Sequence, residues 1–364
     1  MSDNEEDDIV GDLPSSSQGK RVSGGLRRQV LTNKRPPVIP MPFHETPKRD
    51  NTPLTWDEFF DSKTDVTIGD DVFNVYTKGR RGPIFYLLHG GGYSGLTWAV
   101  FAKELLELIE CRVVAPDLRG HGETKCIDEH DLSKETMVKD IGNIFNTTFP
   151  RSENEEVCII GHSMGGAMAV HAGIADVIKA KIVGVVVIDV CEGTAMESIN
   201  GMLTFLQSRP TSFTSVESAI SWCISSKTAR NTTAARVSMP AQIRMAAPNE
   251  YEWRIDLAAT EVYWKGWFEG LSAEFLKLPA SKMLALASVD RLDKTLTVAQ
   301  MQGKFQTAIL QKVGHSIQED NPERLADAIG SFAIRQRFAA PPMIVHSPTP
   351  SPRAEEVQSP PKNN

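Results

Sequence analysis

The chain has 364 residues, of which 41% are hydrophobic and 23% are charged, and its formal net charge is −7. This length and apolar content allow one large or two ordinary globular domains and exclude a small scaffold with a minimal core. The acidic balance argues against a nucleic-acid-binding protein, because a surface that follows phosphates needs an excess of Lys and Arg.

The first predicted segment is a disordered tail over residues 1–52. It is rich in Ser, Gly, Pro and charge, with almost no hydrophobic periodicity. It begins with acidic residues and lacks the apolar run of a signal peptide, so we expect a cytoplasmic protein. Basic pairs such as Lys20-Arg21 leave nuclear import open as an alternative to ordinary solvated charge.

Residues 53–192 and 279–339 alternate short apolar runs with amphipathic segments, which predicts a mostly parallel sheet with helices on both faces. The first predicted strand has alternating polarity, so we expect it to be antiparallel, whereas the later strands are continuously apolar. The predicted strands are Asp71–Thr77, Ile84–Leu88, Arg112–Ala115, Val157–Ile160, Ile182–Ile188, Met283–Ala287 and Phe305–Leu310. The predicted helices are Trp98–Ile109, Lys134–Phe145, Gly165–Ile174 and Glu323–Arg337.

Residues 193–278 interrupt this alternation with helical patterns and loops but no convincing strand of the central sheet. We expect this insertion to form a cap, because sheet enzymes hold their sites at the carboxyl ends of the strands. Its aromatic side chains predict partner recognition, with packing of the cap onto the sheet as the alternative for each of them. These side chains are Trp222, Trp253, Tyr263, Trp264 and Trp267.

The remaining features give no sign of a metal site or a membrane span. Residues 340–364 are Pro- and Ser-rich and predict a second disordered tail. The five cysteines stand singly, without a CxxC pair or a Cys/His cluster of zinc-ligand spacing, and predict reduced thiols. No run approaches the roughly 18 apolar residues that a membrane span requires.

The sharpest motif runs from Val157 to Gly166 and reads Val-Cys-Ile-Ile-Gly-His-Ser-Met-Gly-Gly. A strand that enters Gly-x-Ser-x-Gly and continues into a helix is typical of the nucleophile elbow of α/β-hydrolases. Gly161 and Gly165 are needed because side chains there would clash with backbone in the sharp turn. The motif predicts Ser163 as a nucleophile beside a helix N-terminus, whose dipole favours developing negative charge.

A glycine run follows an earlier predicted strand, in Leu88-His89-Gly90-Gly91-Gly92. It resembles the HGGG motif that contributes to the oxyanion hole in this fold. Attack on an ester carbonyl creates an oxyanion that amide N–H groups stabilise. We expect one donor to be the Met164 amide and the other to be Gly91 or Gly92. A plain strand-to-helix turn is the alternative interpretation of the glycines.

The general base is found by elimination, because this fold orders its triad as Ser, acid and His along the chain. Five of the eight histidines precede Ser163; among them, His121 is expected to order the loop around it. His171 lies two turns into the helix after the elbow, and His346 lies in the C-terminal tail. His315 remains as the predicted base, in a loop between the last predicted strand and the last predicted helix.

Two carboxylates compete for the acid of the triad. Asp189 and Asp290 each follow an apolar predicted strand, so both are expected at the carboxyl edge of the sheet. The commonest arrangement in this fold takes the acid from the later strand, which favours Asp290 or its neighbour Asp293. The carboxylate that is not the acid would be structural, and Asp290 in that role would cap a helix or pair with Arg291.

Several segments resemble the protein phosphatase methylesterase family more specifically than α/β-hydrolases in general. The resemblance extends over residues 56–338 and includes Ile188-Asp189-Val190-Cys191-Glu192-Gly193-Thr194-Ala195-Met196, Trp253-Arg254-Ile255-Asp256-Leu257 and Met301-Gln302-Gly303-Lys304-Phe305. In that family the first of these segments holds the triad acid. The resemblance therefore favours Asp189 over Asp290.

The resemblance implies hydrolysis of the methyl ester on the C-terminal leucine of the catalytic subunit of type-2A protein phosphatase. The reaction would follow acyl-enzyme chemistry at Ser163 with His315 as the base, without a metal or organic cofactor. A small-molecule esterase or lipase of the same fold is one alternative. A non-catalytic phosphatase-binding protein that keeps the fold as a scaffold is the other.

Overall fold

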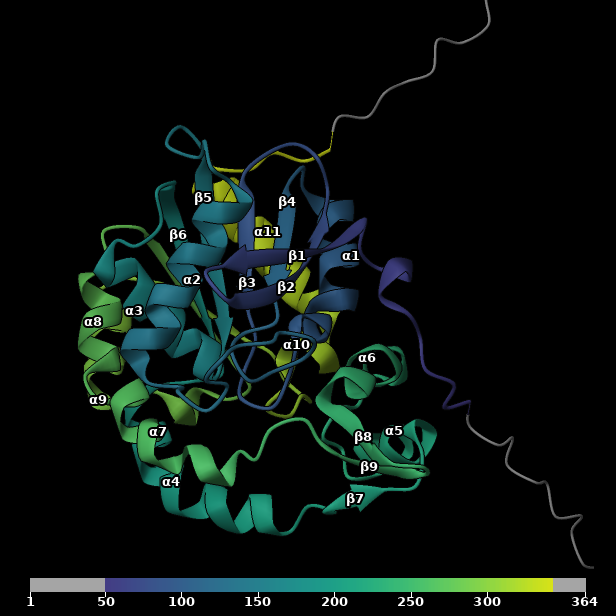
Figure 1. The fold of residues 1–364 in the computed structure, drawn as a ribbon. Helices are drawn as coiled ribbons and strands as arrows, with labels where there is room; N and C mark the ends of the chain where they lie inside the picture. Colours follow the sequence, from purple (N-terminus) through teal and green to yellow (C-terminus); the bar gives the residue numbers. More distant parts are fainter. Residues whose placement is uncertain (1–49, 343–364) are drawn as a thin grey trace, which may run out of the picture. The chain divides into compact units, whose positions relative to one another are not determined.

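The computed structural model describes residues 50–342, in which an eight-stranded sheet carries helices on both faces (Figure 1). Most of the predicted N-terminal tail, residues 1–49, lies outside the described residues. The predicted C-terminal tail lies outside them from residue 343 onward.

The central sheet contains all seven predicted strands and one more. Its strands are β1 (Ser62–Ile68), β2 (Asp71–Lys78), β3 (Ile84–Leu88), β4 (Arg112–Pro116), β5 (Glu156–His162), β6 (Lys181–Ile188), β10 (Ser281–Leu286) and β11 (Gln306–Ile309). Their order is β1-β2-β4-β3-β5-β6-β10-β11. As expected, β2 is antiparallel to its neighbours, and the strands from β4 to β11 pair in parallel.

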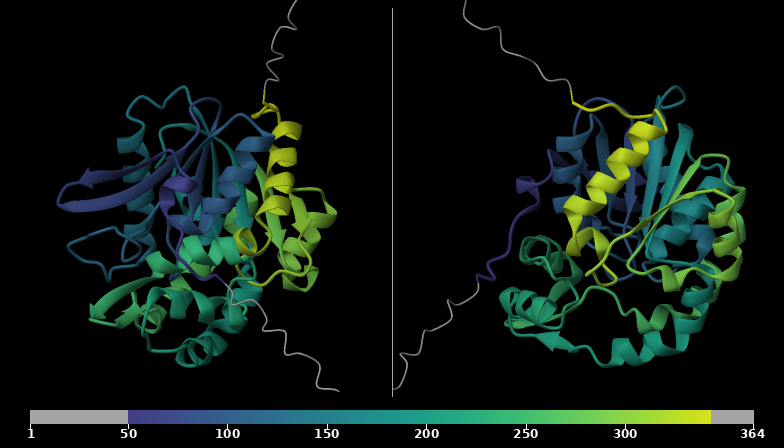
Figure 2. Two further views of the ribbon diagram at one scale, coloured as in Figure 1. Left: turned by 90° about the vertical axis from the view of Figure 1, so that its right-hand side faces the viewer. Right: turned by 180° about the vertical axis from the view of Figure 1, so that it is seen from behind.

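The helices divide between the two faces of the sheet, and the four predicted ones are all present. Figure 1 shows α2 (Lys134–Thr148) and α3 (Met164–Ala175) in front of the sheet, with α11 (Pro322–Arg335) behind it. The rear view in Figure 2 brings α11 to the front, where it packs with α1 (Ala99–Leu108). Along the chain, the short helix α9 (Lys294–Met301) precedes β11 and the short helix α10 (Ile317–Asp320) follows it.

Strand β3 illustrates why these strands are continuously apolar. Ile84, Tyr86 and Leu88 belong to the core shared with α2 and α3. Phe85 and Leu87 point to the opposite core, shared with α1 and α11. Because successive side chains of a strand face opposite sides, a sheet covered on both faces must be apolar at every position.

The segment between β6 and β10 lies outside the central sheet and has a small sheet of its own. It contains α4 (Glu192–Gln207), α5 (Val216–Ser225), α6 (Thr232–Ser238), α7 (Glu261–Phe268) and α8 (Leu271–Lys277), with a small antiparallel sheet of β7 (Ser212–Phe213), β8 (Ile243–Ala247) and β9 (Glu250–Trp253). No strand of this segment joins the central sheet within residues 50–342. The small sheet packs on α5 through its own core, which includes Phe213 and Ile220. The limits 193–278 of a functional cap stay a prediction.

The loop after β4 is held by buried ion pairs of Arg119. Its guanidinium donates to both carboxylate oxygens of Asp140, at 2.7 and 3.0 Å, and to Asp71 at 2.8 Å. The side chains of Arg119 and Asp140 are only 8% and 9% exposed. This arrangement ties the loop to α2 and to the start of β2, which agrees with the structural role expected for this segment.

Replacing Arg119 with Met is expected to lower the free energy of unfolding by about 3–5 kcal/mol, because it leaves buried carboxylates without a counter-charge. Arg112→Met is the matched control: its ion pair with Glu155 is more exposed, at 20% and 39%, and should contribute at most about 1 kcal/mol. Urea denaturation of both variants measures the difference. Equal losses would contradict a special role for the Arg119 pairs.

Candidate active site

Ser163 occupies the turn between β5 and α3, where its backbone adopts φ 52° and ψ −119°. Two glycines make this turn possible. A Cβ atom on Gly161 would lie 2.0 Å from the carbonyl oxygen of Gly165, and one on Gly165 would lie 2.3 Å from that of Leu88. Any side chain at either position would push the elbow apart, so the close backbone packing fixes Ser163 in its strained conformation.

The structure pairs His315 with Asp189. Asp189 follows β6 directly, and its buried Oδ2 lies 2.8 Å from Nδ1 of His315. Its Oδ1 accepts the backbone N–H of Ala287 at 3.1 Å. The rival carboxylates have other contacts: Asp290 is exposed and accepts from Ser288, while Asp293 caps α9. The geometry therefore favours Asp189 as the partner of His315.

Ser163 and His315 line one pocket, but no hydrogen bond between their side chains is found in the described part of the chain. The His315 side chain is 48% exposed, so space is available around the ring. A general base must reach hydrogen-bond distance of the proton that it removes, and such contacts commonly tighten only with substrate bound. Ser163 and His315 must therefore come within hydrogen-bond distance before Ser163 can transfer its proton.

His162 supports the loop that carries His315. Its Nε2 lies 2.9 Å from the carbonyl oxygen of His315, and its Nδ1 lies 3.3 Å from the Gln318 side-chain nitrogen. Burial lowers the pKa of His162 well below its usual value. A neutral imidazole with the proton on Nε2 satisfies both contacts, donating to the loop and accepting from Gln318. Sequence reasoning set this residue aside, although its place beside Ser163 puts it at the sheet edge.

Arg291 places a cation beside the candidate triad. Its Nη1 lies 2.9 Å from Oδ2 of Asp189, the same oxygen that His315 contacts. One interpretation of the sequence paired Arg291 with its neighbour Asp290, whereas the structure turns it toward Asp189. Because both groups contact the same oxygen, they restrict rotation of the Asp189 carboxylate and keep it directed toward His315.

The candidate oxyanion hole has fewer available N–H donors than the sequence predicts. The Gly92 N–H donates to Nε2 of His121 at 2.9 Å, while Nδ1 of His121 lies 2.8 Å from the carbonyl oxygen of Arg119. Burial lowers the pKa of His121 to about 4, so the ring is neutral and can accept this bond. Because the Gly92 amide is already used, Gly91 and Met164 remain as candidate donors beside Ser163.

The pocket around Ser163 has a volume of about 340 Å³ and is lined largely by the insertion. Trp264 and Trp267 are 2% and 3% exposed, and their indole N–H groups bond to Thr260 and Leu132. These two side chains pack the insertion onto the core. Trp222 and Trp253 are partly exposed and stack on each other with ring centroids 5.5 Å apart. The four tryptophans of the insertion therefore divide into a packing pair and an accessible pair.

Residues 50–342 offer no group of three or more His, Cys, Asp or Glu side chains that could hold a metal ion. Nor does any helix in this range combine the length and the apolar character that a membrane span needs. All five cysteines are free thiols.

Comparisons with known proteins show the family to which the chain belongs. Residues 85–328 match the family model described as "Alpha/beta hydrolase family". The chain is 61% identical to "Probable protein phosphatase methylesterase 1" of Caenorhabditis elegans, over 92% of this chain and 91% of that protein. It is 44% identical to "Protein phosphatase methylesterase 1" of Mus musculus, over 81% of this chain and 88% of that protein. It is 38% identical to the protein of the same name from Schizosaccharomyces pombe, over 80% of this chain and 89% of that protein.

Solved structures share the fold at low sequence identity. The structure of E-2-(acetamidomethylene)succinate hydrolase superposes with a TM-score of 0.63 at 19% identity, over 75% of this chain and 99% of that one. A thioesterase domain from the curacin biosynthetic pathway superposes with a TM-score of 0.58 at 19% identity, over 74% of this chain and 98% of that one. These likenesses concern the fold alone.

Exchanging Asp189 for Asn is expected to lower kcat by about 10³–10⁴-fold with little change in stability, because an amide cannot stabilise the imidazolium of His315. Asp290→Asn is the matched control and should remain close to wild type. Steady-state kinetics and thermal melting of both variants measure this. An inactive Asp290→Asn enzyme beside an active Asp189→Asn enzyme would mean that Asp290 is the acid.

A second prediction concerns Glu319, which lies buried in α10 and accepts a 2.7 Å hydrogen bond from Thr97. Burial raises the pKa of its carboxyl from 4.5 to about 7. Between these values the folded state binds more protons than the unfolded state, so this carboxyl makes the protein less stable as pH rises. Glu319→Gln removes the effect, and the free-energy difference between wild type and variant should change by up to about 1.4 kcal/mol per pH unit. Urea denaturation measures the free energy of unfolding of both proteins. If this free energy changed equally in the two proteins from pH 5 to pH 7, the prediction would be wrong.

Proposed function

Because this chain belongs to the protein phosphatase methylesterase family of α/β-hydrolases, we propose that it removes the methyl ester from the C-terminal leucine of the type-2A phosphatase catalytic subunit. The observation that carries the proposal is the pocket that contains Ser163 on its elbow together with His315, which is hydrogen-bonded to Asp189. A serine at a pocket wall with an oriented imidazole is the constellation that acyl transfer requires.

In the proposed reaction the Oγ atom of Ser163 attacks the ester carbonyl carbon while Nε2 of His315 takes the hydroxyl proton. The amides of Gly91 and Met164 stabilise the oxyanion, and Asp189 stabilises the imidazolium. The intermediate then expels the methoxy group, which leaves as methanol with the proton of His315. Water attacks the resulting acyl-enzyme with the same assistance, releasing a free carboxylate and regenerating Ser163.

The chemistry of the pocket supports an apolar C-terminal residue. Met202, Phe205 and Phe268 line it together with the tryptophans of the insertion. A leucine methyl ester is uncharged and gains free energy when its side chain leaves water in such a pocket. A small-molecule esterase would need the same chemistry but no contacts beyond the pocket.

We further propose that the insertion, residues 193–278, recognises the phosphatase. Trp222 and Trp253 are the accessible aromatic side chains at the pocket, and partly exposed aromatic residues are typical anchors of protein interfaces. Phe205 is 57% exposed at the same pocket and would add apolar contact area. Trp264 and Trp267 take no part in this proposal, because they pack inside the protein.

Ser163→Ala is expected to abolish demethylation of the methylated phosphatase, since it removes the hydroxyl that forms the proposed acyl-enzyme. The measurement is mass spectrometry of the phosphatase C-terminus before and after incubation. Ser226→Ala is the matched control, because Ser226 lines the same pocket away from the elbow and should be dispensable. Wild-type rates for Ser163→Ala would end the proposal. Activity of the wild type on small esters but not on the phosphatase would favour the small-molecule alternative.

A further inference from the structure

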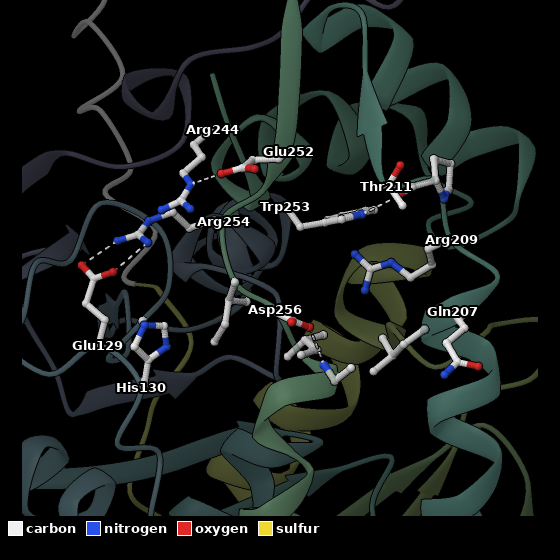
Figure 3. Close-up of a pocket in the computed structure, with 16 residues that line it drawn as sticks. Glu129, His130, Gln207, Arg209, Thr211, Arg244, Glu252, Trp253, Arg254 and Asp256 are labelled. Carbon is white, nitrogen blue, oxygen red and sulfur yellow. Dashed lines mark hydrogen bonds and ion pairs between the residues drawn. The ribbon is translucent and has the colours of Figure 1, made fainter. Parts of the chain in front are cut away.

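A second cavity adjoins the active-site pocket, and the two share a wall. The cavity has a volume of about 510 Å³ and lies between the insertion and the loop after β4 (Figure 3). Leu206, Arg209, Trp253 and Leu257 line both spaces. A chain that leaves the pocket of Ser163 along this wall therefore passes the side chain of Arg209.

Arg209 is the unusual charge in this wall. Its guanidinium carbon lies 3.4 Å from the centroid of the Trp253 ring, and Figure 3 shows the group directed into the cavity beneath the indole. Among residues 50–342 no carboxylate pairs with it, and none of its five N–H donors has a protein acceptor. Burial lowers the pKa of Arg209 to about 10, so it still carries its charge at neutral pH.

The other two arginines of the cavity are satisfied. Arg244 pairs with Glu252 at 2.8 Å. Arg254 makes two bonds of 2.9 Å to Glu129. The remaining acid, Asp256, accepts the backbone N–H of Ala258 at 3.0 Å and forms no ion pair among the described residues. Arg209 is thus the cation of this cavity that lacks a counter-charge within the described chain.

A partly desolvated guanidinium without a partner is costly, because burial removes water that would otherwise satisfy its donors. Stacking on Trp253 offsets a part of this cost and fixes the plane of the group. Such a pre-oriented fork is suited to a carboxylate, which can accept two parallel hydrogen bonds. The carboxylate must come from outside the described chain.

We propose that Arg209 binds an acidic side chain of the substrate polypeptide, located upstream of the residue whose C-terminal ester lies at Ser163. This inference rests on the proposed function and adds a sequence preference to it. The methyl ester itself is uncharged and needs no cation, so the guanidinium acts on the chain that leads away from it. Arg209 is a specificity-determining residue and takes no part in bond breaking.

The test uses the full chain and pairs of alanine-based peptides that end in leucine methyl ester. Within each pair one upstream position carries Asp or the isosteric Asn, and the position is moved along the peptide. At one or two neighbouring positions kcat/KM should be about 10- to 100-fold higher for Asp, the gain expected from a charge-assisted contact. Arg209→Gln should reduce this ratio to near one while leaving the Asn peptide almost unaffected.

Arg244→Gln is the matched control, since it removes a positive charge from the same cavity but one that is already paired. It should keep the preference for Asp. Arg209→Lys should keep a part of it, because the charge remains while the planar fork is lost. Hydrolysis of a small ester and the thermal midpoint show whether each variant retains its active site and fold.

Three results would overturn the inference: an Asp-to-Asn ratio near one at all positions in the wild type, an unchanged ratio in Arg209→Gln, or an equal loss on both peptides. The last would assign Arg209 to packing against Trp253. If the proposed function itself were wrong, the wild type would not demethylate the methylated phosphatase, whatever the ratio measured on the peptides.

Discussion

The close approach of backbone at the elbow is the constraint on which the active site depends. Gly161 and the carbonyl of Gly165 meet at a distance that leaves no room for a side chain, and this contact forces the chain to reverse from β5 into α3. Ser163 stands at the reversal with a positive φ and faces the carboxyl edge of the sheet. The parallel neighbours of β5 then bring the other reacting groups to the same edge, with Asp189 after β6 and the glycine run after β3.

Around this edge, polar contacts hold the reactive groups through the backbone as much as through side chains. His162 fixes the carbonyl of His315, and His121 fixes the amide of Gly92. Both rings are buried and neutral, which lets one nitrogen donate while the other accepts. The insertion supplies what the core lacks: an apolar, aromatic wall at the pocket of Ser163, and next to it Arg209, a cation without a carboxylate partner among residues 50–342.

Features with strong periodicity or a fixed motif could be predicted from the sequence, and those set by long-range contacts could not. The buried strands, the helices α1, α2, α3 and α11, Ser163 and His315 follow from local pattern and chain order. Strand β1 is mostly polar because it lies at the edge of the sheet, and β7 has only two residues. Neither therefore shows a hydrophobic pattern from which a strand could be predicted. The pairing of Arg291 with Asp189 depends on how two loops meet, about which residue spacing says nothing. The choice of Asp189 came from family resemblance rather than from position.

The central claim is that demethylation proceeds through an acyl-enzyme at Ser163. The most direct measurement is titration of the full chain with a fluorophosphonate, with the labelled residue located by peptide mass spectrometry and the demethylation of methylated phosphatase followed in parallel. We expect one label per chain, at Ser163, and loss of demethylation in proportion to labelling. Full labelling of Ser163 with demethylation unimpaired would contradict it.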